Sequence, residues 1–341
     1  MTEDLAVAAP APAPVTSPTK GRPTLARHVT VATKPFGRDR GRIGNDQHST
    51  DPRAGSFRVD AHHGEILQGV FVTGDKLRRG LVTLPCPLYS TRATFLPTED
   101  TGTTVRPAWR SKARRAADLT LARLGHPVPG GLLDITSDIP LCRGFGSSTA
   151  DVTSAIGAVL AATGRRLTPA EVGALAVEAE TASDSLMYGG RAVVFAHREG
   201  EPIEDLGELM PLAVLGFGTS PGGRGVDTLE LPPARYTSWE IEAFRPLRGL
   251  LRRAIGDGDA RLLGRVATAS TLLNQRHLPI PGLDDILAVA RAAGAAGVQV
   301  AHSGDVAGLI FDAADGETPA RLEFAATRLD VTETWQFETE R

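Results

Sequence analysis

The sequence predicts an α+β protein, in which strands and helices are grouped rather than strictly alternating. Residues 57–96 contain three β-rich segments with alternating apolar residues and short turns between them. A glycine-rich turn at residues 144–148 is followed by a helical pattern of small apolar residues. Beyond residue 235, three helical stretches precede a last pair of strands. This grouping favours α+β architecture over a doubly wound parallel sheet.

The composition is that of an ordinary globular protein. The 341 residues are enough for two domains with substantial cores, and 41% of them are hydrophobic and 23% charged. The net charge of −3 gives no sequence-wide attraction to nucleic acid or to an anionic membrane, so we expect neither partner. Two cysteines cannot form a disulfide framework, and no apolar run could span a bilayer. We therefore expect a reduced, cytoplasmic setting.

Residues 1–54 differ in composition from the rest of the chain. Residues 8–24 are rich in alanine and proline, and residues 37–53 are polar with scattered arginines. Neither stretch can bury enough apolar surface to offset the entropy lost on ordering, and the segment lacks the apolar core of a secretory signal. We expect a disordered tail here. A first domain over residues 55–205 and a second over residues 206–341 would follow, with the boundary near residues 200–212.

Local signals place most of the elements between these bounds. Residues 107–124 are predicted to form a helix, whose charged residues Arg110, Arg114 and Arg115 should face solvent. Thr168 and Glu171 form a capping box with proline at the first helical position, which predicts a helix to about residue 181. The polar residues 198–208 should contain the domain boundary. Other expected elements are strands over 189–198, 211–219, 298–302 and 307–311, and helices over 239–255, 260–275 and 283–294.

Residues 140–149, Pro-Leu-Cys-Arg-Gly-Phe-Gly-Ser-Ser-Thr, follow an apolar strand and open a helix expected over 149–162. Gly144 and Gly146 let the backbone approach a phosphate closely, and the first N–H groups of a helix carry partial positive charge. Ser147 and Ser148 add hydroxyl groups that can bind a phosphate oxygen or a magnesium ion. The sequence therefore predicts a site for the triphosphate of a nucleotide.

Other interpretations of this turn are less specific. A serine that only caps the helix is the plainest of them, since any helix can use one there. The usual P-loop is excluded because it needs a glycine followed by lysine, and this turn has none. A dinucleotide site is weakly supported because the third glycine and the ribose-binding carboxylate are lacking.

Two acids follow the turn in the chain. Glu180 and Asp184 are four residues apart and would share one face if the helix continued past residue 181. Two facing carboxylates repel unless a cation lies between them or one is protonated. Magnesium keeps several waters, so one carboxylate and one hydroxyl can hold it; an exposed acidic helix end is the alternative. The eight histidines show no metal-ligand spacing, and His62 and His63 should be local hydrogen-bonding residues.

The string at residues 140–149 resembles the second motif of the GHMP kinases, the superfamily of galactokinase, homoserine kinase and mevalonate kinase. Its ending is most similar to that of the L-threonine kinases of cobalamin and propanediol metabolism. The resemblance spans residues 56–312 and implies a domain similar to domain 2 of ribosomal protein S5, a ferredoxin-like C-terminal domain, and an active site between them. Further segments that resemble these threonine kinases are residues 64–69, 85–89, 222–228, 274–275 and 301–308.

The resemblance implies a kinase that uses ATP and Mg²⁺ to phosphorylate a small-molecule hydroxyl. Ser148 and Glu180 would hold the magnesium ion, and Asp184 would accept the proton of the substrate hydroxyl. Threonine kinases place the glutamate three residues before the aspartate, whereas this chain places it four before. The residues expected to bind ATP and its phosphates are Pro140, Arg143, Gly144, Phe145, Gly146, Ser147, Ser148 and Thr149. The residues expected to line the substrate site are Glu65, Gln68, Asp227, Ser303 and Gly304.

The resemblance favours L-threonine or a related hydroxy amino acid as substrate, with homoserine, a sugar or an isoprenoid alcohol as alternatives. A binding protein of the same fold without catalysis is another alternative, but a protein that only binds a ligand does not need paired acids.

Residues 218–222 also match the nucleophile elbow of hydrolases around Ser220, with Asp284 and His302 in the right order. Pro221 excludes this, because it lacks the N–H that an oxyanion hole requires. A homodimer stays an open possibility.

Overall fold

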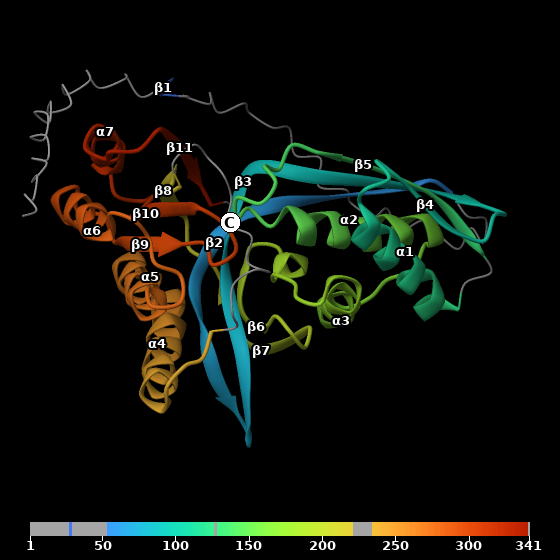
Figure 1. Ribbon diagram of the computed structural model, residues 1–341, viewed down its shortest axis with the longest axis horizontal. Coiled ribbons are helices and arrows are strands. Elements are labelled where there is room, and N and C mark those ends of the chain that lie inside the picture. Colours follow the sequence, from blue (N-terminus) through green and yellow to red (C-terminus); the bar gives the residue numbers. More distant parts are fainter. Residues whose placement is uncertain (1–26, 29–52, 126–127, 221–233, 340–341) are drawn as a thin grey trace, which may run out of the picture.

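The structure, a computed structural model, describes residues 27–28, 53–125, 128–220 and 234–339 of the 341-residue chain. Of the expected tail over residues 1–54, only residues 27–28 and 53–54 lie in the described part. Asp227, expected in the substrate site, lies outside it. The described strands form one eleven-stranded sheet with two groups of helices, one on each half of the molecule (Figure 1).

The sheet is antiparallel in nearly all of its described pairs. Only β1 with β11 and β4 with β5 run parallel among them, which confirms the α+β class and excludes a doubly wound parallel sheet. The strands are β1 (Arg27–His28), β2 (Gly55–Thr73), β3 (Lys76–Thr98), β4 (Gly102–Arg106), β5 (Gly130–Ser137), β6 (Arg191–Ala196), β7 (Glu201–Glu208), β8 (Leu212–Gly218), β9 (Gly297–Val300), β10 (Val306–Asp312) and β11 (Glu333–Glu338).

The helices agree with the expected ones to within a few residues at each end. The capping box of Thr168 and Glu171 is present at the start of α3, with proline at the first helical position. The helices are α1 (Ser111–Leu124), α2 (Ser147–Thr163), α3 (Pro169–Glu180), the 3₁₀ turn η1 (Leu186–Tyr188), α4 (Ser238–Asp257), α5 (Ala260–Asn274), α6 (Leu283–Ala292) and α7 (Thr318–Ala326).

In the N-terminal half, α2 is buried around most of its circumference. It packs against β2, β3, α1 and α3, and its small side chains let these elements approach closely. The long strands β2 and β3 form a hairpin, and β3 continues the sheet through β5 to β4. This packing fixes the N-terminal end of α2, where the glycine turn lies.

The C-terminal half has the expected ferredoxin-like topology. Its strands lie in the order β11-β8-β10-β9 and are antiparallel throughout. Helices α4, α5 and α6 connect β8 to β9, and α7 connects β10 to β11. Strand, helix, two strands, helix and strand in this arrangement define the ferredoxin-like fold. These helices form the left-hand group of Figure 1.

The polar residues 198–208, around which the domain boundary is expected, contain part of the sheet. Residues 201–208 form β7, an edge strand that pairs with β6 and leaves one face to solvent. A cut between residues 205 and 206 would divide this strand. We therefore propose that the boundary lies at residues 209–211, between β7 and β8.

The two halves of the sheet join next to the expected active site. Strand β9 pairs with β2 through Val300 and Glu65, so a residue of the expected substrate site lies at the junction itself. The hairpin of β2 and β3 runs between the two groups of helices (Figure 1). In the part of the chain that the structure describes, no helix has the length and apolar character needed to cross a bilayer.

Candidate active site

The glycine turn has the geometry of an anion site. Gly144 and Gly146 have φ of 94° and 71°, values that glycine adopts at little cost. Helix α2 begins at Ser147 with Gly146 as its N-cap residue, and no side chain caps it. The serine-cap interpretation is therefore wrong, and the first N–H groups of the helix stay available to a phosphate.

Strand β2 holds the backbone of this turn in place. The Gly64 N–H donates to the Gly144 carbonyl and the His62 N–H to the Phe145 carbonyl, both at 3.2 Å. The Phe145 side chain is buried, so it anchors the turn in the core rather than contacting a ligand. A Cβ on Gly146 would overlap the His62 ring, so only glycine fits there. Pro140 is half-buried at the start of the turn.

A cluster of hydroxyl and carboxylate groups lies at the same helix end. The Ser148 hydroxyl donates to Glu180 at 2.5 Å. The Thr149 hydroxyl lies 3.0 Å from Glu180 and 3.2 Å from the Asp184 carboxylate, and the Asp184 N–H lies 3.2 Å from the same hydroxyl. Helix α3 ends at Glu180, and Thr181 turns the chain with φ of 77°. The two acids therefore meet at Thr149 and not along a continued helical face.

The surroundings of the two acids shift their pKa values in opposite directions. Burial and repulsion from Asp184 raise the pKa of Glu180 to about 7, against the hydrogen bonds from Ser148 and Thr149. Burial also acts to raise the pKa of Asp184, but the charge and hydrogen bond of His62 outweigh it and lower the pKa. Asp184 is thus the carboxylate that stays ionised at neutral pH, and Glu180 is poised to accept a cation.

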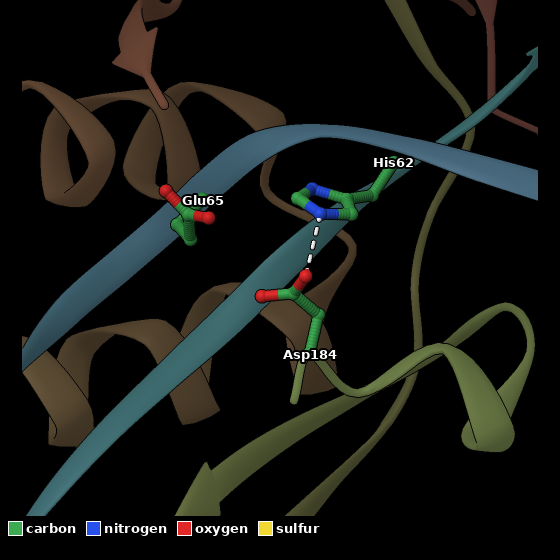
Figure 2. A group of neighbouring side chains, drawn as sticks. All are labelled: His62, Glu65 and Asp184. Atoms are coloured by element: carbon green, nitrogen blue, oxygen red, sulfur yellow. Dashed lines mark hydrogen bonds and ion pairs between the residues drawn. The ribbon is translucent and has the colours of Figure 1, made fainter. Parts of the chain in front are cut away.

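His62 is a site residue that the sequence did not reveal. Its Nε2 lies 3.0 Å from the Asp184 carboxylate, 122 residues away, a contact that goes beyond the local hydrogen bonding expected of this residue (Figure 2). Its Nδ1 lies 3.2 Å from the Gly64 carbonyl. Both ring nitrogens face acceptors, so both must carry hydrogen and the ring is an imidazolium. Burial opposes this charge, but Asp184 raises the pKa of His62 to about 9.

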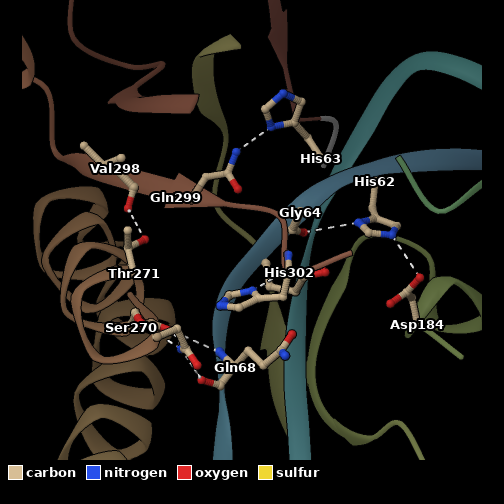
Figure 3. A network of polar contacts seen from close by, with 12 residues as sticks. His62, His63, Gly64, Gln68, Asp184, Ser270, Thr271, Val298, Gln299 and His302 are labelled. Carbon is tan, nitrogen blue, oxygen red and sulfur yellow. Dashed lines mark hydrogen bonds and ion pairs between the residues drawn. The ribbon is translucent and has the colours of Figure 1, made fainter. Parts of the chain in front are cut away.

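The sequence feature that could have revealed His62 as a site residue is the pair of adjacent histidines before Gly64. Successive residues of a strand point to opposite sides, so one of two adjacent histidines must face the glycine turn. Figure 3 shows His62 directed toward Asp184 and His63 toward Gln299. Burial lowers the pKa of His63 to about 3, so this ring is neutral and part of the core.

Among the expected substrate residues, Glu65 lies closest to the acids. The carboxylate of Glu65 is 2% exposed and accepts from the His302 backbone N–H at 2.9 Å and from Nδ1 of His302 at 2.8 Å. One ligand atom from each of His62, Glu65 and Asp184 lies within 4.8 Å of the other two. His302 pairs with Glu65 and not with Asp284, so the hydrolase triad is not assembled.

The structure also describes the expected substrate residues Gln68, Ser303 and Gly304. The backbone of Gln68 bonds to Ser270 and Asn274 of α5, and its side chain is half-buried (Figure 3). Ser303 is exposed at the turn after β9. A Cβ on Gly304 would overlap the backbone at Arg143, so this glycine packs against the glycine turn.

Two cations occupy places that differ from those expected. The Arg143 guanidinium pairs with Asp305 at 2.9 Å and with Glu333 at 2.5 Å, both on the C-terminal half, and does not extend over the turn. Arg110, expected in solvent, is buried in an ion pair with Asp151 of α2. Lys112 instead lies beside the turn, 3.3 Å from the Ser148 hydroxyl.

The donor set at α2 suits a magnesium ion. Magnesium takes hard oxygen ligands, and Ser148 and Glu180 supply a hydroxyl and a carboxylate. No basic side chain among the described residues forms an ion pair with Glu180, so a bound cation would offset the energetic cost of burying its charge. His62, Glu65 and Asp184 are close enough to hold a metal, but both His62 nitrogens are already bonded.

Two family models match this chain. The N-terminal domain of the GHMP kinases matches residues 111–196, and the C-terminal domain of the GHMP kinases matches residues 248–329. The L-threonine kinase of Salmonella typhimurium is 26% identical over 278 residues, which cover 80% of this chain and 87% of that one. The homoserine kinase of Moorella thermoacetica is 32% identical over 223 residues, 56% of this chain and 66% of that one.

Solved structures share the fold at low sequence identity. Homoserine kinase from Cytophaga hutchinsonii has a TM-score of 0.59 at 16% identity, with 86% of this chain and 96% of that chain covered. The complex described as MDDEF with MVAPP, AMPPCP and magnesium has a TM-score of 0.59 at 15% identity, with 84% and 97% covered.

The matches to both domain models, together with the glycine turn and the acid cluster, show that the chain belongs to the GHMP kinase family. It is a phosphotransferase of the kinase class. Kinases of this family use ATP.

Proposed function

We propose that this protein transfers the terminal phosphoryl group of Mg²⁺-ATP to the hydroxyl of L-threonine or a related hydroxy amino acid. The observation that carries this proposal is the contact of Ser148, Glu180, Thr149 and Asp184 at the open N-terminal end of α2. Phosphoryl transfer needs a phosphate cradle, a cation site and a group that orients the attacking hydroxyl. The N-terminal end of α2 would hold the phosphates, Ser148 and Glu180 the cation, and Asp184 the attacking hydroxyl. Hydrogen bonds through Thr149 connect the two acids.

The backbone of the turn is suited to the phosphates of ATP. Residues 144–149 present the uncapped N–H groups of α2 together with the positive end of its dipole. Lys112 is near enough to the Ser148 hydroxyl to reach a phosphate oxygen placed there. We therefore assign Lys112 to the phosphate site in place of Arg143, whose guanidinium is bound by two carboxylates.

Ser148 and Glu180 would hold the magnesium ion, which would neutralise the phosphate charge that develops during transfer. Asp184 would accept a hydrogen bond from the substrate hydroxyl and so aim its oxygen at the phosphorus. A lowered pKa makes Asp184 a weak base. A weak base suffices, because the transition state of phosphoryl transfer is loose and needs little deprotonation of the nucleophile.

The choice of L-threonine rests on the relatives. The Salmonella typhimurium L-threonine kinase covers most of both chains, whereas the Moorella thermoacetica homoserine kinase covers 56% of this one. The proposal therefore gives L-threonine precedence and keeps homoserine as the next candidate.

A substrate panel with coupled detection of ADP tests the function. The purified chain would be mixed with ATP, Mg²⁺ and one compound at a time: L-threonine, L-serine, L-homoserine, galactose or mevalonate. We expect ADP to form fastest with L-threonine, and phosphothreonine to be detected by mass spectrometry. Faster turnover of galactose or mevalonate would overturn the substrate assignment, and binding of ATP without turnover of any compound would overturn the catalytic function.

A further inference from the structure

The Thr149 hydroxyl lies between the two acids and is engaged by both. Its oxygen accepts the Asp184 N–H at 3.2 Å, and its hydrogen faces the Glu180 carboxylate at 3.0 Å and Asp184 Oδ2 at 3.2 Å. A hydroxyl has only one hydrogen and two lone pairs, and this residue is 3% exposed. The contact with a phosphate that the sequence predicts for Thr149 would therefore need a hydroxyl that is buried and already bonded.

The Asp184 carboxylate is held through one of its two oxygens. Oδ2 accepts from Nε2 of His62 at 3.0 Å and lies 3.2 Å from the Thr149 hydroxyl. Among the described residues no hydrogen bond reaches the other oxygen, Oδ1, and Figure 2 shows it directed away from His62. The side chain is 17% exposed. Oδ1 is thus the oxygen that can accept a hydrogen bond from a ligand.

The backbone around Asp184 is fixed on both sides. The Ser183 N–H donates to the His197 carbonyl at 3.0 Å, and the Ser185 hydroxyl lies 2.7 Å from that of Thr83. Rotation of the side chain is the freedom that these contacts leave to the carboxylate. The terminal torsion of an aspartate is soft, so the two donors on Oδ2 decide where Oδ1 points.

We infer that Thr149 positions Asp184 for the reaction. Together with His62 it holds Oδ2, and it also holds the Asp184 N–H, so that Oδ1 accepts the hydrogen bond of the substrate hydroxyl. A displacement of about 1 Å in such a group can lower a rate by about 100-fold. The inference rests on the proposed function and adds to it a positioning residue that acts through Asp184 and not through ATP.

Thr149→Val tests this inference, because valine keeps the shape of threonine and lacks the hydroxyl. With the alcohol of the substrate panel that is turned over fastest, kcat should fall by about 10-fold, less than for Asp184→Asn because His62 still holds Oδ2. The affinity for ADP at saturating Mg²⁺, measured by calorimetry, should change by less than about twofold. Thr149→Ser, which keeps the hydroxyl, should restore kcat to within about threefold of the wild type.

Thr153→Val is the matched control. Thr153 lies about one turn further along α2 and is 4% exposed, and its hydroxyl has no hydrogen-bond partner among the described residues. The substitution removes a similarly buried hydroxyl but no contact with an acid, so kcat and ADP affinity should both stay at the wild-type values. Thermal unfolding of each variant monitors the fold.

A double-mutant cycle shows whether Thr149 acts through Asp184. In the Asp184→Asn background, Thr149→Val should change kcat by less than about twofold, because the carboxylate that the hydroxyl orients is already absent. Two losses that multiply would show an independent role for Thr149 and would overturn the inference.

The remaining outcomes separate this inference from the proposed function. Weaker ADP binding by Thr149→Val with an unchanged kcat would assign Thr149 to the phosphates and overturn the inference, while phosphoryl transfer would stand. An equal fall in kcat for Thr153→Val, or a wild-type kcat for Asp184→Asn, would also overturn it. Absence of ADP with every alcohol would overturn the proposed function and the inference with it.

Discussion

At the scale of single residues, charge at the site is set by the contact between His62 and Asp184. The ring of His62 is fully buried, and both of its nitrogens face oxygen acceptors. Burial alone would remove its charge, but the adjacent carboxylate reverses this and raises the pKa to about 9. The pair keeps Asp184 ionised and holds its carboxylate at the place proposed for the substrate hydroxyl.

This ion pair predicts how stability changes with pH. The folded-state pKa of His62 is above its ordinary value of 6.5, so the pair stabilises fully below that pH and loses its effect as pH rises through about 9. The loss should be about 3 kcal/mol. Urea unfolding should therefore show a gap between wild type and His62→Gln that is wide near pH 6 and narrow above pH 9.

His277→Gln is the control for this measurement. Burial lowers the pKa of His277, so its effect on stability has the opposite sign and the stability it contributes is lost as pH falls. A gap for His62→Gln that stays constant with pH would show that this ring is not charged in the folded protein.

Asp184→Asn should separate orientation of the hydroxyl from ATP binding. The amide keeps the size of the carboxylate but lacks the negative charge proposed to hold the substrate hydroxyl in line with the phosphorus, so kcat should fall by about 100-fold or more. ATP affinity, measured by calorimetry, should change by less than about threefold because Asp184 contacts no part of the phosphate-binding turn except Thr149. A wild-type kcat would remove Asp184 from the reaction.

Ser148→Ala should raise the Mg²⁺ concentration that gives half-maximal activity by about 10-fold. The substitution removes the hydroxyl that lies 2.5 Å from Glu180, the other expected ligand. Ser147→Ala is the matched comparison, since its hydroxyl is not bonded to Glu180, and it should alter ATP affinity without changing the Mg²⁺ midpoint. Equal Mg²⁺ midpoints for the two variants would contradict the assignment of Ser148.

At the scale of elements, the turn before α2 shows why two glycines are needed. Gly144 and Gly146 have positive φ, and each is also packed closely, against Ala301 and His62 respectively. Gly164 at the other end of the same helix has φ of 61°, but a Cβ there would meet nothing. The cost of a side chain from backbone conformation alone can therefore be measured at Gly164, and compared with the cost from conformation and close packing together at Gly146.

Alanine substitutions at the two ends of α2 should have different effects. Gly164→Ala should cost about 1 kcal/mol of stability, from backbone strain alone, and leave activity intact. Gly146→Ala should lower kcat/KM by about 100-fold or more, because the added methyl would displace His62 or the turn itself. Thermal unfolding and coupled ADP detection on both variants check this, and equal activities would show that the turn tolerates movement.

At the scale of the whole molecule, the turn between β9 and β10 connects the two halves at the site. The N–H groups of Asp305 and Val306 donate to the Arg143 carbonyl at 3.0 and 3.2 Å. The same turn carries His302, which bonds to Glu65. The C-terminal half therefore supports both the glycine turn and Glu65.

Arg143→Gln should test whether Arg143 holds the halves together. It would leave the fully buried Asp305 carboxylate without its charge partner, at a cost of about 3 kcal/mol in unfolding free energy. Adding Asp305→Asn should recover part of this loss, as a double-mutant cycle would show. If Arg143 mainly binds phosphate, Arg143→Gln would instead raise the KM for ATP with little change in stability.

Most of the fold could be predicted from local patterns. The capping box at Thr168 and Glu171, the small-residue pattern of α2 and the glycine turn each depend on neighbours in the chain. The polar composition of β7 did not predict a strand, because an edge strand with one exposed face resembles a loop in composition. Arg110 was mistaken for a surface residue, because its partner Asp151 lies on another helix.

The sequence by itself determined the α+β class, the glycine turn before α2 and the two acids, because each is recorded in the spacing of residues close together in the chain. Only the tertiary structure decided the charge of the site and the partners of Glu65. His62 meets Asp184 across 122 residues, and Glu65 meets His302 across 237. The first contact depends on how the chain after α3 packs against β2, and the second on how the sheet joins its two halves, which no local pattern encodes.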